Sequence, residues 1–234
     1  VDLVVLIDSG DAMKGLADTF SKVVGTAIGV ARTRGIAAPR VTYLGIDGVF
    51  PYSVFMVTVR GYLTMVRKVD EASLSCRPRS RRTGRQEEAS AQGKGNAGNA
   101  LVDILTHFDW RPGAARNVLF LGHGPLDGLL CNPTAGEPDV EVASRIVEVA
   151  TRLGICVHMG LADAGPSCPD TEAHGGWRER IEAEYERVAV ETGGQLFIAQ
   201  DSLFTCLAMI ESALDGSTRG APVDPAPGAR PDEP

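Results

Sequence analysis

The sequence lacks any apolar run approaching the roughly 20 residues that a membrane-spanning helix requires. It also lacks the charged-then-apolar start of a signal peptide. Positive charge is in deficit, because 23 Lys and Arg residues face 30 Asp and Glu residues, which gives a net charge of −7. This balance argues against general binding to nucleic acid or other polyanions. These absences predict an ordinary soluble, cytoplasmic protein with neither membrane nor nucleic acid as a partner.

Cysteine is scarce as well, with five residues in a chain of 234. An odd number of cysteines, in a chain large enough to fold without disulfides, favours a reduced cytoplasmic setting. The composition is 44% hydrophobic, which suffices for one large domain whose folding buries roughly 70% of the unfolded surface. The chain begins at Val1 rather than at Met, which indicates a processed chain or a domain of a longer protein.

Segments with the pattern of buried strands alternate with segments of helical spacing along the chain. The predicted strands are 1–8, 41–46, 54–59, 117–121, 155–161 and 195–199. The second and third are expected to be neighbours, and one of them is a candidate antiparallel edge. The alternation predicts an α/β fold with a doubly wound, mostly parallel six-stranded sheet and helices on both faces.

Two segments fall outside this pattern. Residues 73–96 are polar and Arg-rich, and they are predicted to form a loop within the domain. The last 20 residues contain five prolines, which preclude a packed element. We therefore expect one domain over residues 1–214, followed by a Pro-rich linker or disordered tail over residues 215–234.

The opening segment, VVLIDSGDA from Val4 to Ala12, is an apolar run that ends in an acidic turn before a helix. In α/β proteins such a turn delivers a carboxylate, here that of Asp8, to the carboxyl edge of a parallel sheet. Ligands of these folds bind at that edge. Asp8 is therefore the first candidate functional residue.

The carboxyl-terminal half contains LGICVHMGL at residues 153–161 and TGGQLF at residues 192–197. In this order, and joined to the Asp8 turn, these motifs resemble the von Willebrand factor A (vWA) family over most of residues 1–214. In that family the opening turn reads Asp-x-Ser-x-Ser, and the carboxylate and both hydroxyls serve a divalent cation. Gly10 and Ala12 stand at the two hydroxyl positions of this chain.

The other two metal loops of the family are altered here as well. The family's threonine corresponds to Gly95, which precedes Asn96 in a glycine-rich stretch, and its acidic residue corresponds to His123. Of the expected ligand set only Asp8 remains, whereas Mg²⁺ demands nearly octahedral oxygen ligands. The resemblance therefore implies a degenerate metal site without Mg²⁺.

Two interpretations of the altered loops are open. Asp8, Asp11 and His123 could together hold Zn²⁺ or another divalent cation, because imidazole and carboxylate groups suit such ions. Alternatively, Asp11 caps the first helix, and Asp8 and His123 form a hydrogen-bonded pair that replaces the ion. We favour the second interpretation, which leaves a recognition surface without metal.

A second resemblance concerns the sequence VLFLGHG at residues 118–124. It is similar to the strand ending in His-Gly of caspase-like peptidases, and it implies a cysteine peptidase with His123 as general base and Cys168 as nucleophile. Cys168, however, lies several residues beyond its strand. Cys131 and His174 lie in neighbouring loops, so a zinc site or a Cys131–Cys168 disulfide are further alternatives. Loop thiols without a ligand role are favoured over both.

The one basic concentration in this acidic chain lies in the predicted loop. Arginine recognises carboxylates and phosphates bidentately, but the loop has no aromatic residues on which bases could stack. We expect these arginines to contribute electrostatic attraction to a partner. They are Arg77, Arg79, Arg81, Arg82 and Arg85.

The sequence thus favours a non-enzymatic protein–protein interaction module, vWA-like with a degenerate metal site and no cofactor. The resemblance implies a partner that is another protein or another domain of the same polypeptide, such as an AAA+ ATPase or a bacterial regulatory or defence component. A cysteine peptidase and a Zn²⁺- or Mg²⁺-dependent ligand-binding domain are the alternatives. The expected binding edge comprises Asp8, Gly10, Asp11, Ala12, Gly95, Asn96 and His123.

Overall fold

Strands and helices alternate along the chain in the computed structural model, which describes residues 1–8, 10–36, 38–76, 97–126, 136–162 and 176–215. The strands are β1 (Asp2–Ile7), β2 (Arg40–Gly45), β3 (Arg116–Gly122), β4 (Ile155–Ala162) and β5 (Leu196–Ala199). The longer helices are α1 (Lys14–Thr33), α3 (Ala97–His107), α4 (Gly136–Leu153), α5 (Trp177–Glu191) and α6 (Leu203–Asp215). Short helical segments are η1 (Asp11–Met13), α2 (Val59–Gly61), η2 (Tyr62–Val66) and η3 (Glu71–Ser73).

The five strands form one parallel sheet in the order β2-β1-β3-β4-β5. From β1 the chain first moves outward to β2 and then crosses to the other side of β1 to form β3. The strand order therefore reverses between β1 and β3. In open parallel sheets the crevice outside the carboxyl ends of the strands at this reversal is the usual ligand site.

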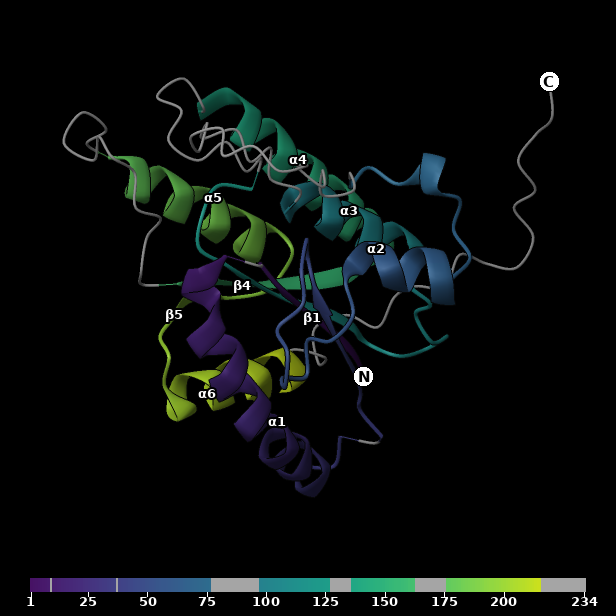
Figure 1. Cartoon of the computed structure of the whole chain (residues 1–234), viewed down its shortest axis with the longest axis vertical. Coiled ribbons are helices and arrows are strands. Elements are labelled where there is room, and N and C mark those ends of the chain that lie inside the picture. The colour runs from purple at the N-terminus through teal and green to yellow at the C-terminus, as the bar shows by residue number, and fades with distance from the viewer. Residues whose placement is uncertain (9, 37, 77–96, 127–135, 163–175, 216–234) are drawn as a thin grey trace, which may run out of the picture.

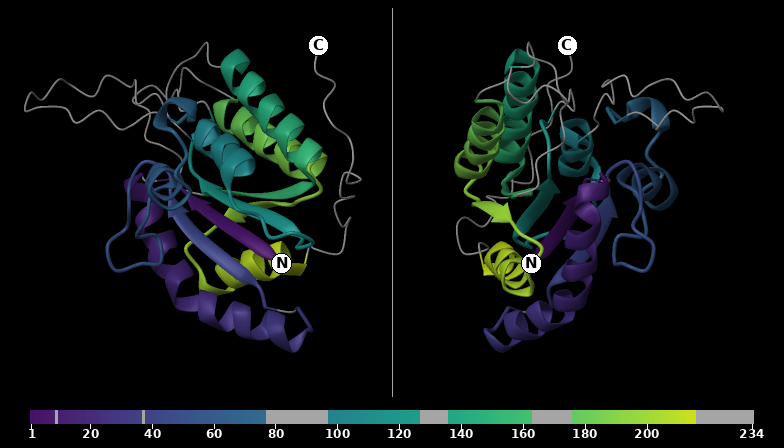
Figure 2. Two further views of the ribbon diagram at one scale, coloured as in Figure 1. Left: turned by 90° about the vertical axis from the view of Figure 1, so that its right-hand side faces the viewer. Right: turned by 60° about the vertical axis from the view of Figure 1, so that its left-hand side comes forward.

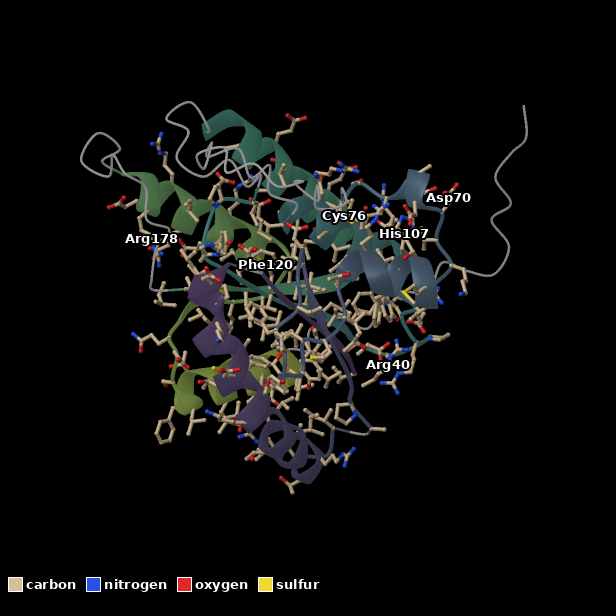
Figure 3. All side chains as sticks on the ribbon, in the orientation of Figure 1. Arg40, Asp70, Cys76, His107, Phe120 and Arg178 are labelled. Atoms are coloured by element: carbon tan, nitrogen blue, oxygen red, sulfur yellow. The ribbon has the colours of Figure 1, made fainter. Side chains whose placement is uncertain are left out.

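Helices cover both faces of the sheet (Figures 1 and 2). Helices α1 and α6 pack on one face, where Leu3 and Val5 join the core, and α3, α4 and α5 pack on the other, where Val4 and Leu6 join it. This explains why β1 reads as an unbroken apolar run, since strands covered on both sides need no polar face. Phe120, labelled in Figure 3, packs edge-on against Tyr185 with ring centroids 5.7 Å apart.

The predicted third strand at 54–59 is wrong, which leaves the sheet of the described residues with five strands rather than six. Phe50 and Phe55 instead bracket a tight turn, because the Phe50 amide donates to the Phe55 carbonyl at 3.0 Å and the Ser53 hydroxyl donates to the Phe50 carbonyl at 2.7 Å. Only Thr58 bridges β2, at Gly45, before the chain enters α2.

Buried apolar positions account for most of the other elements, and local chemistry accounts for their ends. Helix α1 is followed by Gly35 with a φ of +87°, a conformation that glycine adopts without strain. Helix α6 begins after Ser202, whose hydroxyl accepts a hydrogen bond from the Thr205 amide at 3.2 Å. Cys206 is fully buried on that helix, whereas Cys156 on β4 keeps partial exposure.

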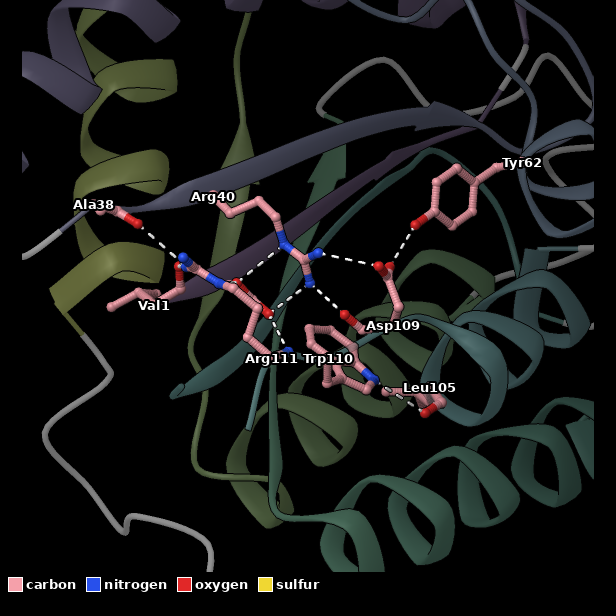
Figure 4. Close-up of polar contacts among 9 residues, drawn as sticks. Val1, Ala38, Arg40, Tyr62, Leu105, Asp109, Trp110 and Arg111 are labelled. Atoms are coloured by element: carbon pink, nitrogen blue, oxygen red, sulfur yellow. Dashed lines mark hydrogen bonds and ion pairs between the residues drawn. The ribbon is translucent and has the colours of Figure 1, made fainter. Parts of the chain in front are cut away.

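The amino edge of the sheet is closed by an ionic network around Asp2, which is fully buried (Figure 4). Its carboxylate accepts from Arg40 Nη2 at 2.7 Å, from Arg111 Nε at 2.6 Å and from the Arg111 amide at 2.7 Å. Arg40 also pairs with Asp109, whose other carboxylate oxygen accepts from the Tyr62 hydroxyl at 2.7 Å. Burial alone would raise the pKa of Asp2, but these hydrogen bonds outweigh burial and lower it.

Some predicted segments lie outside the described residues, namely most of the Arg-rich loop and all but the first residue of the Pro-rich tail. The beginning of that loop is ordered, because the buried Asp103 of α3 accepts hydrogen bonds from the amides of Ser75 and Cys76, at 2.9 and 2.8 Å. Among the helices of the described ranges, none combines the length and apolarity needed to cross a bilayer.

Candidate functional site

The carboxyl ends of β1 and β3 bring two predicted site residues together. Asp8 follows β1, and its amide donates to the Leu121 carbonyl of β3 at 2.8 Å, which fixes the start of the turn. His123 follows β3, the adjacent strand. These two residues therefore face each other across the reversal of strand order, although 114 positions separate them in the sequence.

The imidazole of His123 lies beside the Asp8 carboxylate, with Nδ1 2.8 Å from Oδ2. The carboxylate oxygen does not lie along the in-plane N–H direction, so Nδ1 lacks a well-aligned hydrogen bond. The contact is therefore one of close electrostatic proximity, which becomes an ion pair when the ring is protonated. The side chains are 11% exposed for His123 and 24% exposed for Asp8, so the pair lies at the surface of the edge.

The same imidazole packs directly on Gly10. A Cβ atom at position 10 would lie 2.5 Å from Cε1 and 2.7 Å from Nε2 of His123, distances that no real pair of such atoms tolerates. The ring therefore fills the space that a side chain at position 10 would enter. The His123 ring can hold this position only with glycine at position 10, because the side chain of a serine would displace the ring.

The backbone around His123 is held from below by a buried tyrosine of α5. The Tyr185 hydroxyl donates to the Gly124 carbonyl at 2.8 Å, and Gly122 leaves no room for a side chain beside Tyr185 and Phe120. These contacts with buried residues fix the position of the loop that contains His123.

Asp11 and Ala12 are both exposed within η1, at the mouth of the site. The prediction that Asp11 caps the first helix is wrong, because Gly10 holds the N-cap position and no side chain caps it. Nor do Asp8, Asp11 and His123 meet as ligands. The described part of the chain contains no group of three or more His, Cys, Asp or Glu side chains placed to hold a metal ion.

A divalent cation does not fit the residues present at the Asp8 turn. Position 10 offers no hydroxyl, and the space beside it holds an imidazole. Among the described residues, the carboxylate that lies at this point is that of Asp8, and it already contacts the ring. Mg²⁺ keeps oxygen ligands in nearly octahedral geometry, which one carboxylate and one nitrogen ligand cannot supply.

The remaining predicted site residues lie outside the described residues. They are Gly95 and Asn96 of the binding edge, the five arginines 77–85, and Cys131, Cys168 and His174. The loop that carries Gly95 leads into α3, which meets the edge through the Gly98 amide. That amide donates to the Leu126 carbonyl at 2.8 Å, in the loop that contains His123.

One residue of the same edge escaped the sequence reasoning as a site residue. Asp201 follows β5 and accepts a hydrogen bond from the Thr19 hydroxyl of α1. Its carboxylate also packs against Gly15, where it leaves no room for a side chain. It ties α1, which follows the Asp8 turn, to the end of the last strand. Its signal was an acidic residue two positions after a strand, close to the pattern that revealed Asp8.

The parallel strand order and the edge site define a Rossmann-like α/β protein. No protein-family model matches the sequence, and a search of curated proteins found no match.

Proposed function

We propose that this chain is a non-enzymatic protein-interaction module of the vWA type, which binds its partner through the carboxyl edge around Asp8 and His123 without a metal ion. The observation that supports the proposal most directly is the position of the His123 ring, which packs on Gly10 and beside Asp8. In the vWA motif a serine and the cation belong at this point. An edge preserved in shape but refilled with protein side chains supports recognition by surface fit and hydrogen bonds.

The surroundings of the pair suit recognition better than chemistry. Asp11 and Ala12, which follow Gly10 in the sequence, are exposed, and the Cε1 and Nε2 atoms of His123 lie against Gly10. Loops at the carboxyl edge can also vary without disturbing the buried strands, which is where recognition commonly evolves.

A matched pair of charge insertions tests the proposal. Ala12→Arg places a bulky cation at the mouth of the proposed surface, and Ala72→Arg makes the identical change at an exposed position of η3. Both variants should keep the thermal midpoint of the wild type. In quantitative affinity capture from cells that express the chain, partners retained by wild type and Ala72→Arg should be lost with Ala12→Arg. Equal capture by all three would place recognition elsewhere.

Metal dependence is tested on the same samples. Calorimetric titration with Mg²⁺, Mn²⁺ and Zn²⁺ should give no binding in the micromolar range, and capture should be unchanged by a chelator. A Mg²⁺ signal that disappears in Asp8→Ala would instead establish a functional cation site. Zn²⁺ binding that disappears in His123→Ala would establish the transition-metal alternative.

The cysteine-peptidase alternative has its own decisive assay. A thiol-directed activity probe and a peptide library should give neither labelling nor cleavage above those of the Cys168→Ala and His123→Ala variants. Activity lost in both variants would replace the interaction proposal with an enzyme.

A further inference from the structure

Within the described residues, no strand pairs with the outer edge of β5. Because the Met159 amide donates to the Gln195 carbonyl at 2.9 Å, parallel geometry directs the polar backbone groups of Phe197 toward β4. The amide and carbonyl groups of Leu196 and Ile198 therefore point away from the sheet. No described residue provides them with a hydrogen-bond partner. Two donors and two acceptors are thus presented in a row.

Apart from its short length of four residues, this edge carries no charge, proline or bulge of the kind that keeps strands from pairing with other molecules. Residues 192–200 read TGGQLFIAQ and contain no charge in a chain that is 23% charged. Apolar side chains are exposed beside it, with Ile198 39%, Leu203 51% and Phe204 85% exposed.

The opposite edge of the sheet differs. The outward amide of Gly45 at the end of β2 already donates to the Val57 carbonyl at 2.9 Å, and β2 begins with the charged Arg40. Only Val41 and Tyr43 keep outward backbone groups there, because the Arg40 and Ile46 amides donate to β1. The two edges of one sheet are thus unequal, and β5 is the better template.

We infer that a second copy of this chain pairs with β5 in antiparallel orientation, across a two-fold axis at Phe197, and joins two sheets into one. In this register Leu196 of one copy lies opposite Ile198 of the other, and each such pair exchanges two backbone hydrogen bonds. The two-fold axis makes the contact isologous and closed, so association stops at the dimer.

The uncharged edge is a surface through which a second copy can approach. Two chains of net charge −7 repel each other unless they approach through uncharged surface. In the proposed register the nearest acidic residue, Asp201, lies opposite Gly193 rather than another carboxylate. The axis is normal to the sheet, so both copies of α6 lie on one face, where their exposed Leu203 and Phe204 side chains flank the joint.

The test is the oligomeric state of the full 234-residue chain, measured by sedimentation velocity over about 1–200 µM, a range in which mass action resolves a reversible dimer. Wild type should be a dimer at the upper end. Ile198→Pro removes one outward amide and no bond to β4, and it should weaken the dimer at least about tenfold. Val41→Pro makes the same change at the β2 edge and should leave the dimer intact.

A second pair of variants tests the side chains. Phe204→Lys should weaken the dimer, whereas Tyr52→Lys, which changes a fully exposed aromatic residue in the loop after β2, should not. Hydrogen exchange supplies a readout that does not depend on mutation, since the amides of Leu196 and Ile198 should become protected only at high concentration. A monomeric wild type throughout the series would refute the inference. A dimer that survives both Ile198→Pro and Phe204→Lys would refute it as well, and protection of these amides only by another protein would assign the edge to that partner.

Discussion

Among single residues, His158 shows how burial decides chemistry. It is 2% exposed on β4, its ring stacks on Phe197 with centroids 6.3 Å apart, and Nε2 lies 3.4 Å from the Cys156 sulfur. Burial lowers the pKa of His158 to about 4 and raises the pKa of Cys156 to about 11. Both side chains are therefore neutral near pH 7. A neutral thiol beside a neutral imidazole is a packing contact and not an activated nucleophile.

The buried histidine should make stability depend on pH. The unfolded chain takes up the proton near pH 6.5, whereas the folded chain resists it until about pH 4, so stability falls as pH falls through this window. We expect the free energy of unfolding to drop by about 2 kcal/mol between pH 7.5 and 5. Urea denaturation of wild type and His158→Leu measures this, and the variant should lose the dependence. His107→Leu serves as the control and should retain it.

Gly10 and His123 should behave as one unit. Gly10→Ser forces the imidazole out of its seat and should cost about 1–3 kcal/mol of stability, as overpacking does. In a His123→Ala background the same serine has room, so its cost should nearly vanish. A double-mutant cycle by denaturant unfolding measures the coupling. Gly25→Ser, at a glycine of α1 with open space around it, is the matched control. Equal costs of Gly10→Ser in both backgrounds would show that the ring does not occupy this space.

At the level of elements, the sheet is held differently at its two ends. The amino ends of β1 and β2 and the segment before β3 meet at buried Asp2, with Arg40 and Arg111 as its partners. At the carboxyl ends, the loop of His123 is held by the Tyr185 hydroxyl on the Gly124 carbonyl and by the contact with Asp8. A rigid amino end leaves the carboxyl end free to differ in sequence, as expected of a recognition surface.

Loss of Asp2 should be costly. Asp2→Ala leaves two arginines without their buried carboxylate and should cost about 3–5 kcal/mol. Glu211→Ala removes only the partially exposed Glu211–Arg34 pair and should cost less than about 1 kcal/mol. Thermal and denaturant unfolding of both variants at neutral pH gives the comparison. If both variants lost less than about 1 kcal/mol of stability, water would be the partner of Arg40 and Arg111 in Asp2→Ala.

Periodicity predicted most elements, because burial on both faces marks β1 and β3, and helical spacing marks α1 and α6. It failed at 54–59, where the apolar residues are β-branched and aromatic but Phe55 packs against Phe20 and Tyr43 from a turn rather than from a strand. Local composition cannot distinguish a turn from a strand here, because the turn is held by a contact distant in the sequence. The Val54 amide donates a hydrogen bond to the Ser21 hydroxyl of α1. The approach of Asp8 and His123 was the favoured prediction from the sequence, because both residues follow strands that were expected to end at the same edge of the sheet.

On the scale of the whole molecule, the described residues that form the two core clusters on either side of the sheet all lie within residues 3–214. The last of their residues, Leu214, is fully buried near the end of α6. Stability should therefore reside in this part of the chain. The residues beyond it are rich in proline and contribute little apolar surface to bury.

Removal of residues 216–234 should accordingly leave the free energy of unfolding unchanged within about 0.5 kcal/mol, as for surface changes. Asp215 stays in the truncated chain because it pairs with Arg34. Denaturant unfolding of the full and truncated chains gives the comparison, and a truncation to residue 209 provides the destabilised control, since it removes the buried Ile210, Ala213 and Leu214. A large loss of stability on removal of residues 216–234 would show that the tail contributes to the core.

The central place of β1 has a consequence for the synthesis of the protein. β1 leaves the ribosome before the other strands of the sheet, but its second neighbour, β3, ends only at Gly122. At about 5–20 residues per second, translation of the intervening chain takes roughly 6–23 s. Throughout that interval one side of a strand that is completely buried in the finished protein stays unpaired beside other nascent chains. Slower translation before β3 should therefore lengthen the exposure of this strand and increase the loss of the nascent chain to aggregation.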